Sequence, residues 1–305
     1  LGFDILARAQ EAPVSDFVPE INGAGPVTDK EDVGLLCSCQ SLEPLLGAAR
    51  AEHEENVALG GCCCGCRVGT SDFRELVELE RKHANAKTIE NTMQTNGVLL
   101  DDAWGEFLAA NRFLIGLSID GPRAIHDAGR VDKGGAPSFD KAMRGLGFLK
   151  KHGVEFNTLT AVHSGNSRLP LEVYRFLKAT GSGFMQFIPV VERIPDGAAP
   201  GREAFLSPHS SAAWRVSKWS VEPAQYGNFL CAIFDEWVRH DVGKVFVQLF
   251  DVALEAWVGM EPGLCVFQRT CGSAAVIEHN GDMYSCDHYV YPEDRLGNIL
   301  QQPLD

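Results

Sequence analysis

Three cysteines near the end of the chain have the spacing of a redox site. Cys265, Cys271 and Cys286 are separated by five and fourteen residues, and Asp287 follows the last of them directly. Thiolates held at fixed separations are the ligands of iron–sulfur clusters, and a carboxylate beside them can act as a general base. These residue types predict a cluster held by the three cysteines, with Asp287 next to it.

A tight turn is expected to orient the last of these cysteines. Residues 276–287 contain Asn280-Gly281 between two strand-like arms, which is the strongest short-range signal for a β-hairpin. Cys286 and Asp287 lie on the far arm, so the hairpin would fix the directions of their side chains. The alternative is that the three thiols are buried independently and that Asp287 is only an exposed residue of the hairpin.

The composition excludes several classes of protein. The chain has 305 residues, of which 45% are hydrophobic, and a formal net charge of -14. This length supports a full core, and the negative charge disfavours nucleic acid as a partner because phosphates would be repelled. No apolar run reaches the roughly 18 residues of a membrane span, and residues 1–13 lack the pattern of a secretory signal. We therefore expect a cytoplasmic protein in which the ten cysteines serve metal or redox chemistry rather than disulfides.

From residue 72 onward, helical and strand-like segments alternate. The pattern predicts strands at 88–94, 113–119, 154–162 and 184–190 and helices at 73–84, 102–111, 139–152 and 171–180. This alternation indicates a parallel sheet with crossover helices, and both an open doubly wound sheet and a (β/α) barrel fit it. In either fold the functional edge lies at the carboxyl ends of the strands. The polar residues expected at that edge are Gln94, Asn96, Ser118 and Asp120.

The segment that follows these elements differs in composition. Residues 193–219 are rich in Pro, Ala, Ser and Gly, which indicates a long surface connection. Glu222-Pro223 then opens a helix to about His240, followed by a short strand at 245–250 and a helix at 252–257.

Several of these segments carry motifs that resemble radical S-adenosylmethionine enzymes. The motifs are Gln94-Thr95-Asn96-Gly97, Leu117-Ser118-Ile119-Asp120-Gly121-Pro122, Arg130-Val131-Asp132-Lys133 and Gln186-Phe187-Ile188-Pro189. Cys286-Asp287-His288-Tyr289-Val290 and Arg295-Leu296-Gly297-Asn298-Ile299 resemble the start of the SPASM extension. Together and in this order, the motifs are most similar to anaerobic sulfatase-maturating enzymes. The resemblance covers residues 72 to 305 apart from 197–218.

The resemblance implies an α/β fold, a partial (β/α)6 barrel followed by the start of a SPASM region. It implies one [4Fe–4S] cluster that binds S-adenosylmethionine and two auxiliary [4Fe–4S] clusters in the SPASM region. The implied reaction oxidises a cysteine or serine in a Cys/Ser-x-Pro-x-Arg segment of a sulfatase to Cα-formylglycine. The implied partners are this sulfatase polypeptide and an electron donor such as a flavodoxin or ferredoxin.

The motifs also imply roles for individual residues. Ser118 and Asp120 match strand-end residues that approach S-adenosylmethionine, and Arg130 matches a partner for its carboxylate, which arginine suits geometrically. Gln94 and Asn96 match positions that face the cofactor. Asp287 matches the base that takes a proton from the substrate. The resemblance implies that three of the four ligands of the first auxiliary cluster are Cys265, Cys271 and Cys286.

The two ends of the chain depart from the family pattern. The C-x3-C-x2-C motif that holds the radical cluster does not occur, and Gly60-Gly61 is followed by cysteines instead of Glu-Pro. Neighbouring cysteines in 62–66 point apart, so we do not expect them to replace the motif. We interpret residues 1–68 as an out-of-frame or degenerate counterpart of the first barrel units. Residues 69–262 are then the partial barrel with its linking helices, and 263–305 are an incomplete SPASM region.

Two other functions are compatible with the same residues. One is a SPASM enzyme that modifies a different peptide, because the barrel and the hairpin do not define the substrate. The other is a catalytically inactive barrel that binds a protein partner or a metal.

We predict that this chain does not cleave S-adenosylmethionine, because it lacks the C-x3-C-x2-C ligands of the radical cluster. After anaerobic reconstitution with iron and sulfide, dithionite and S-adenosylmethionine should yield less than a single turnover of 5′-deoxyadenosine by mass spectrometry. Enzyme-like turnover would refute this prediction.

Overall fold

The structure of the chain is a computed structural model, which describes residues 32–36, 56–60, 69–84, 88–132, 134–197, 206–270, 275–278 and 280–302. For residues 32–36, 56–60 and 72 only the backbone is described. Among the described residues, no helix combines the length and the apolar character needed to cross a bilayer.

The described strands form one large sheet in the order β12-β11-β10-β1-β2-β3-β4-β5-β6-β9, together with a separate β7-β8 hairpin. The strands are β1 (Asp32–Leu36), β2 (Asn56–Gly60), β3 (Asn91–Thr95), β4 (Leu114–Ser118), β5 (Phe156–Val162), β6 (Phe184–Pro189), β7 (Arg193–Pro195), β8 (Trp214–Val216), β9 (Phe246–Val247), β10 (Ala275–Ile277), β11 (Asp282–Tyr284) and β12 (Arg295–Asn298). All neighbours from β10 to β9 pair in parallel, whereas β11 pairs antiparallel with both β10 and β12.

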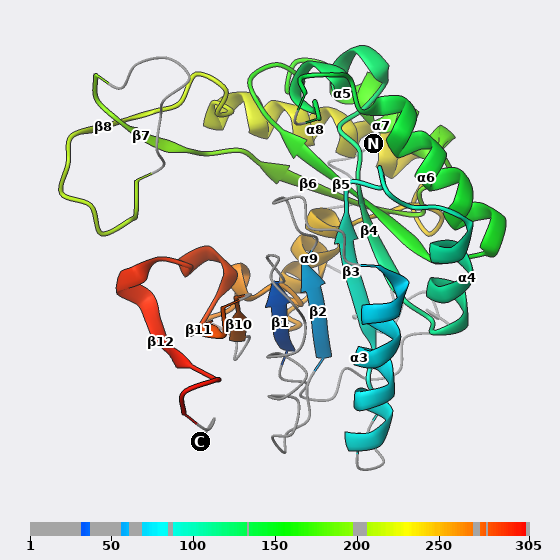
Figure 1. Cartoon of the computed structure of the whole chain (residues 1–305). Helices are drawn as coiled ribbons and strands as arrows, with labels where there is room; N and C mark the ends of the chain where they lie inside the picture. Colours follow the sequence, from blue (N-terminus) through cyan, green and yellow to red (C-terminus); the bar gives the residue numbers. More distant parts are fainter. Residues whose placement is uncertain are drawn as a thin grey trace.

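Helices connect the parallel strands and lie outside the sheet (Figure 1). They are α3 (Thr70–His83), α4 (Asp102–Ala110), α5 (Arg123–Gly129), α6 (Phe139–His152), α7 (Pro170–Ala179), α8 (Pro223–His240) and α9 (Gln248–Trp257), with short 3-10 turns η2 (Cys265–Phe267), η3 (Asp287–Tyr289) and η4 (Pro292–Asp294). In Figure 1 the strand direction changes from upright at β2 to almost horizontal at β6, so the sheet curves. The predicted α/β fold is confirmed, and its curvature is that of a partial barrel.

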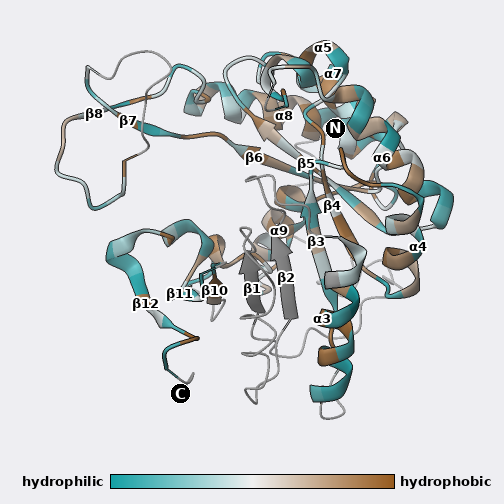
Figure 2. Ribbon diagram, viewed as in Figure 1, coloured by the Kyte–Doolittle hydropathy of each residue, from teal (hydrophilic) through white to brown (hydrophobic). Residues whose placement is uncertain are grey.

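The apolar residues of the central strands and helices form the core. Ile115 and Leu117 on β4 are fully buried, as are Leu146 on α6 and Leu177 on α7, which are at most 2% exposed. Figure 2 shows the same helices with hydrophilic residues on their outer sides. Burial on one face of each helix and within the sheet is what the sequence periodicity predicted, because apolar surface removed from water stabilises the fold.

Two local signals determine where the helices start and end. Asp101 caps α4, since its carboxylate accepts a hydrogen bond of 3.0 Å from the backbone NH of Trp104. At the end of α6, Gly153 has a φ of 67°, a left-handed conformation that glycine adopts without the steric cost of a Cβ. Gly153 explains why α6 ends at His152, as the sequence predicted.

Three elements differ from the sequence prediction. Helix α5 was not expected, and the strand predicted at 245–250 is only Phe246–Val247, because α9 begins at Gln248 instead of residue 252. The segment predicted as a surface connection contains the β7–β8 hairpin, in which Arg193 pairs with Val216 and also lies over the ring of Trp214. Short elements of this kind depend on tertiary contacts more than on periodicity, which is weak over three to seven residues.

Strands β1 and β2 lie inside the segment 1–68 and pair in parallel with each other. They occupy the sheet positions between β10 and β3. The division into 1–68, 69–262 and 263–305 remains a prediction.

We predict opposite effects for two glycine substitutions on α6. A Cβ at Gly145 would lie 2.2 Å from the backbone oxygen of Gly97, so Gly145→Ala must push α6 away from the loop after β3. We expect a loss of about 1–3 kcal/mol in the free energy of unfolding by urea titration. Gly147→Ala is the matched control, since nothing lies within 4 Å of its Cβ. It should stabilise the protein by about 0.5–1 kcal/mol. Equal effects of the two changes would contradict this account of the packing.

Candidate functional site

A buried ion pair lies at the carboxyl edge of the sheet. Asp120, two residues after β4, is 2% exposed. Its carboxylate accepts hydrogen bonds from Nε and Nη2 of Arg130 at 2.6 and 3.0 Å. The backbone NH of Ala161 on β5 donates a third hydrogen bond of 2.9 Å to the same carboxylate. Bidentate pairing and an additional amide offset the cost of burying the charge.

This pairing affects the roles predicted for both residues. The guanidinium of Arg130 uses one edge for Asp120, and its side chain is 28% exposed. Nη1 is not part of that pairing and could donate to a second carboxylate. Asp120 therefore orients Arg130, and contact of either residue with the cofactor remains a prediction.

A chain of hydrogen bonds through His126 holds the backbone around this ion pair. The NH of Asp120 donates to Nδ1 of His126 at 3.4 Å, and Nε2 of His126 lies 3.1 Å from Oγ of Ser138. The Ser138 hydroxyl donates to the carbonyl of Arg130 at 2.8 Å. Burial lowers the pKa of His126, which keeps the ring neutral with its proton on Nε2. Helix α5, which carries His126, was the element missed from sequence.

The other residues predicted at this edge are more exposed. Gln94 is an exposed residue of β3, and Ser118 is the half-buried last residue of β4. Asn96 follows β3 and accepts a hydrogen bond of 3.2 Å from the NH of Val98 through its side chain. All three lie at the carboxyl ends of neighbouring strands, as expected, and their contacts with a cofactor remain predictions.

His163 lies at the same edge and was not assigned a role from sequence. It directly follows β5, and its Nδ1 accepts a hydrogen bond of 3.1 Å from the NH of Gly165. Its Nε2 is buried without a hydrogen-bond partner among the described residues. Burial lowers the pKa of His163, with Asp120 acting in the opposite direction. A polar residue immediately after an apolar strand was the available signal.

The predicted hairpin near the C-terminus is confirmed. Strands β10 and β11 pair antiparallel, with Val276 opposite Tyr284. The turn between them contains Gly281 at a φ of 83°, a conformation that glycine adopts readily. The side chain of Asn280 accepts a hydrogen bond of 3.0 Å from the NH of Asp282, which closes the turn.

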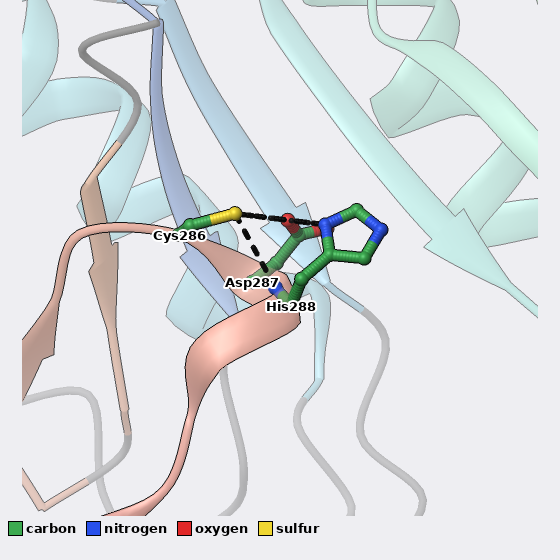
Figure 3. Close-up of side chains that lie close together, drawn as sticks. All are labelled: Cys286, Asp287 and His288. Atoms are coloured by element: carbon green, nitrogen blue, oxygen red, sulfur yellow. Dashed lines mark hydrogen bonds and ion pairs between the residues drawn. The ribbon is translucent and has the colours of Figure 1, made fainter. Parts of the chain in front are cut away.

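Three side chains that could each offer a ligand atom to a metal ion lie close together at the end of this hairpin (Figure 3). Sγ of Cys286 lies 3.4 Å from Oδ1 of Asp287 and 3.5 Å from Nδ1 of His288. Nδ1 of His288 lies 3.0 Å from Oδ1 of Asp287. Figure 3 shows that the side chains of Cys286, which precedes η3, and of Asp287 and His288, which lie on η3, turn toward one another. Asp287 thus lies beside the thiol as predicted, and His288 is an additional member that the sequence prediction did not include.

The thiol environment fits a cationic centre. Burial raises the pKa of Cys286, and the nearby groups of Asp287 and Cys265 raise it further, while the NH of His288 lowers it. An iron or other metal ion would offset this cost of thiolate formation. Cys265 lies on η2 and is exposed, whereas Cys271 lies outside the described residues. The three-cysteine ligand set remains a prediction.

A further carboxylate lies at the functional edge without a partner. Asp251 is in the first turn of α9, directly after β9. Its Oδ2 is buried and has no hydrogen-bond partner among the described residues. Burial, together with the charge of Glu255, raises the pKa of Asp251 to about 6. The sequence prediction missed this residue because a lone Asp in an amphipathic helix carries no specific signal.

Comparison with solved structures defines the class of this fold. The structure of native anSMEcpe with bound AdoMet and Cp18Cys peptide superposes with a TM-score of 0.76 and 30% sequence identity, covering 90% of this chain and 79% of that one. The fold is thus that of a radical S-adenosylmethionine enzyme with a SPASM region. No protein-family model matches the chain.

Sequence comparison gives the particular family. The chain is 48% identical over 234 residues to the serine-type anaerobic sulfatase-maturating enzyme of Bacteroides thetaiotaomicron, covering 77% of this chain and 56% of the relative. It is 35% identical over 241 residues to the cysteine-type enzyme of Clostridium perfringens, covering 78% of this chain and 60% of the relative. The chain belongs to the family of anaerobic sulfatase-maturating enzymes. It spans a little over half the length of these curated relatives.

We predict that the burial of Asp251 makes stability depend on pH. Its folded pKa of about 6 lies above the ordinary value of 3.8 for an aspartate, so the folded state holds the proton more tightly. This contribution to stability is complete at pH 3.5 and is lost as the pH rises through 6. Asp251→Asn should therefore match the wild type near pH 3.5 and exceed its unfolding free energy by about 1–2 kcal/mol at pH 7.5, allowing for partial solvation. Asp235→Asn, an exposed change on α8, controls for the loss of one charge. A difference that does not vary with pH would contradict the prediction.

Proposed function

We propose that this chain forms the cofactor- and peptide-binding part of an enzyme that oxidises a cysteine or serine of a sulfatase to Cα-formylglycine. The observation that carries the proposal is the 48% identity with a sulfatase-maturating enzyme over 234 residues. The geometry supports it, because the carboxylate of Asp287 lies 3.4 Å from the thiol of Cys286, and cysteine thiolates are the usual ligands of iron–sulfur clusters.

The polar residues at the sheet edge would bind and orient S-adenosylmethionine. Arg130, held on one side by Asp120, presents its remaining edge to the carboxylate of the cofactor. Ser118, Gln94 and Asn96, at the ends of β3 and β4, would contact the rest of the molecule. When bound to a reduced [4Fe–4S] cluster, this cofactor supplies the radical that removes a hydrogen atom from the substrate Cβ.

Asp287 would act on the substrate as a base. It would accept the proton released as the substrate carbon becomes an aldehyde, with Nδ1 of His288 at 3.0 Å to stabilise its charge. Cys265, Cys271 and Cys286 would hold an auxiliary cluster nearby, which would take up the electron that leaves the substrate. Asp287 is 62% exposed, so a peptide could reach it without rearrangement of the hairpin.

The radical cluster does not fit the residues of this chain. The C-x3-C-x2-C ligands are absent from the sequence, so no step through that cluster is assigned to the chain itself. The proposal is that the barrel and the hairpin retain the binding and proton-transfer parts of the reaction. The further proposed partners are a flavodoxin or ferredoxin as electron donor, in the cytoplasm.

A chimaera tests the proposal. Residues 69–305 would be placed between the flanking N- and C-terminal segments of the Bacteroides thetaiotaomicron relative, which restores the missing motif and the relative's length. With S-adenosylmethionine, reductant and a peptide containing Cys-x-Pro-x-Arg or Ser-x-Pro-x-Arg, we expect 5′-deoxyadenosine and formylglycine by mass spectrometry. Formation of 5′-deoxyadenosine with modification of an unrelated peptide only would favour another SPASM reaction, and formation of neither product would favour an inactive binding barrel.

We predict that Asp287→Asn in this chimaera separates the two products. Formylglycine formation should fall by about 100-fold or more, because the base is lost, while 5′-deoxyadenosine formation continues. Asp294→Asn provides a control on the neighbouring turn, where Asp294 pairs with His209 at 2.9 Å. It should preserve both products. A parallel loss of both products in Asp287→Asn would contradict the role of Asp287 as a base.

A further inference from the structure

The end of the C-terminal hairpin contains a ligand set that differs from the three cysteines of the predicted cluster. It consists of the thiol of Cys286, the carboxylate of Asp287 and the imidazole of His288 (Figure 3). Among the described residues, this is the one group of three such side chains whose ligand atoms lie within 4.8 Å of one another. Only Cys286 belongs to both sets, so a cluster held by three thiolates does not account for the positions of the other two side chains.

The separations between the three ligand atoms fit one tetrahedral metal ion. Zinc binds thiolate sulfur at about 2.3 Å and imidazole nitrogen or carboxylate oxygen at about 2.0–2.2 Å, so two of its ligand atoms lie about 3.3–3.6 Å apart. Sγ of Cys286 lies 3.4 Å from Oδ1 of Asp287 and 3.5 Å from Nδ1 of His288. The third separation, between Nδ1 of His288 and Oδ1 of Asp287, is slightly shorter at 3.0 Å. Small side-chain rotations are therefore enough to place all three atoms around a single ion.

The backbone of the turn holds this arrangement. The NH of His288 donates a hydrogen bond of 3.4 Å to Sγ of Cys286, and the NH of Tyr289 donates one of 3.1 Å to the carbonyl of Cys286. These two bonds curl η3 around the sulfur, so that three consecutive residues present their ligand atoms to one point. Tyr284, which is 7% exposed, anchors the strand that leads into the turn.

The ligand types indicate the class of ion. A thiolate and an imidazole favour transition ions such as Zn²⁺ over Mg²⁺ and Ca²⁺, which prefer oxygen ligands. Thiolate and carboxylate together balance the charge of a divalent ion, and imidazole binds it as the neutral ring. The side chains of Asp287 and His288 are 62% and 66% exposed, so an ion can reach them from solvent and water can take the fourth position.

We propose that Cys286, Asp287 and His288 form a binding site for one divalent transition ion of the zinc type. The site goes beyond the proposed function, which uses Cys286 as a cluster ligand and Asp287 as a base, and it does not rest on that function. A single ion and the auxiliary cluster compete for the Cys286 sulfur, so they are alternative occupants of the turn. An ion bound here also takes the carboxylate of Asp287 as a ligand and withdraws it from the role of a base.

Cadmium NMR tests the site in the full-length chain, before any treatment with iron and sulfide. Cd²⁺ substitutes for Zn²⁺, and its chemical shift separates a site with one sulfur ligand from sites with several, which the other cysteines of the chain could form. We expect a one-sulfur signal that saturates at one equivalent, is displaced by Zn²⁺ and persists in excess Mg²⁺. Cys286→Ser should remove this signal. His288→Gln and Asp287→Asn should each weaken Cd²⁺ binding at this signal by about tenfold or more.

Two further variants separate this site from the predicted cluster and from a general effect on the fold. Cys265→Ser removes a predicted cluster ligand and should leave the one-sulfur signal unchanged. His240→Gln, an exposed change at the end of α8, should do the same. Without metal, His288→Gln and Asp287→Asn should melt within about 2 °C of the wild type, because both side chains are exposed.

Three results would overturn the inference: no one-sulfur signal in the wild type, unchanged Cd²⁺ binding in His288→Gln, or loss of the signal in Cys265→Ser. Failure of the chimaera to form formylglycine would overturn the proposed function alone, because the ion binds the chain without any cluster.

Discussion

The buried carboxylate of Asp120 is the constraint that organises the edge of the sheet. A charge that is only 2% exposed requires compensation, and three groups supply it: two nitrogens of Arg130 and the backbone NH of Ala161. These contacts connect the end of β4 to β5 and to the residue after α5. The orientation of the Arg130 guanidinium is therefore a consequence of satisfying Asp120. The neutral ring of His126 and the hydroxyl of Ser138 complete the arrangement, because they satisfy backbone groups at both ends of the ion pair.

The C-terminal hairpin is organised by a turn, and the side chains of Asp287 and His288 at its end are exposed. Gly281 and Asn280 close the turn, and the last residues of the hairpin place Cys286, Asp287 and His288 within contact distance of one another. Because Asp287 and His288 are more than 60% exposed, their geometry depends on local backbone direction rather than on packing. An exposed group of this kind is accessible to a macromolecular substrate. This is the property that a base acting on a polypeptide needs.

The sheet edge and the hairpin belong to a chain whose sequence contains no C-x3-C-x2-C motif for the radical cluster. The ion pair at the sheet edge and the hairpin do not depend on that cluster for their hydrogen bonds.

The sequence by itself determined the alternating strands and helices, the hairpin at Asn280-Gly281 and the proximity of Asp287 to Cys286. These are local properties, set by periodicity, turn chemistry and adjacency in the chain. Only the tertiary structure decided that Arg130 binds Asp120, and that Oδ2 of Asp251 and Nε2 of His163 are buried with no hydrogen-bond partner among the described residues. Each of these depends on groups that are distant in sequence, since burial and pairing of a charge are decided by what the fold brings against it.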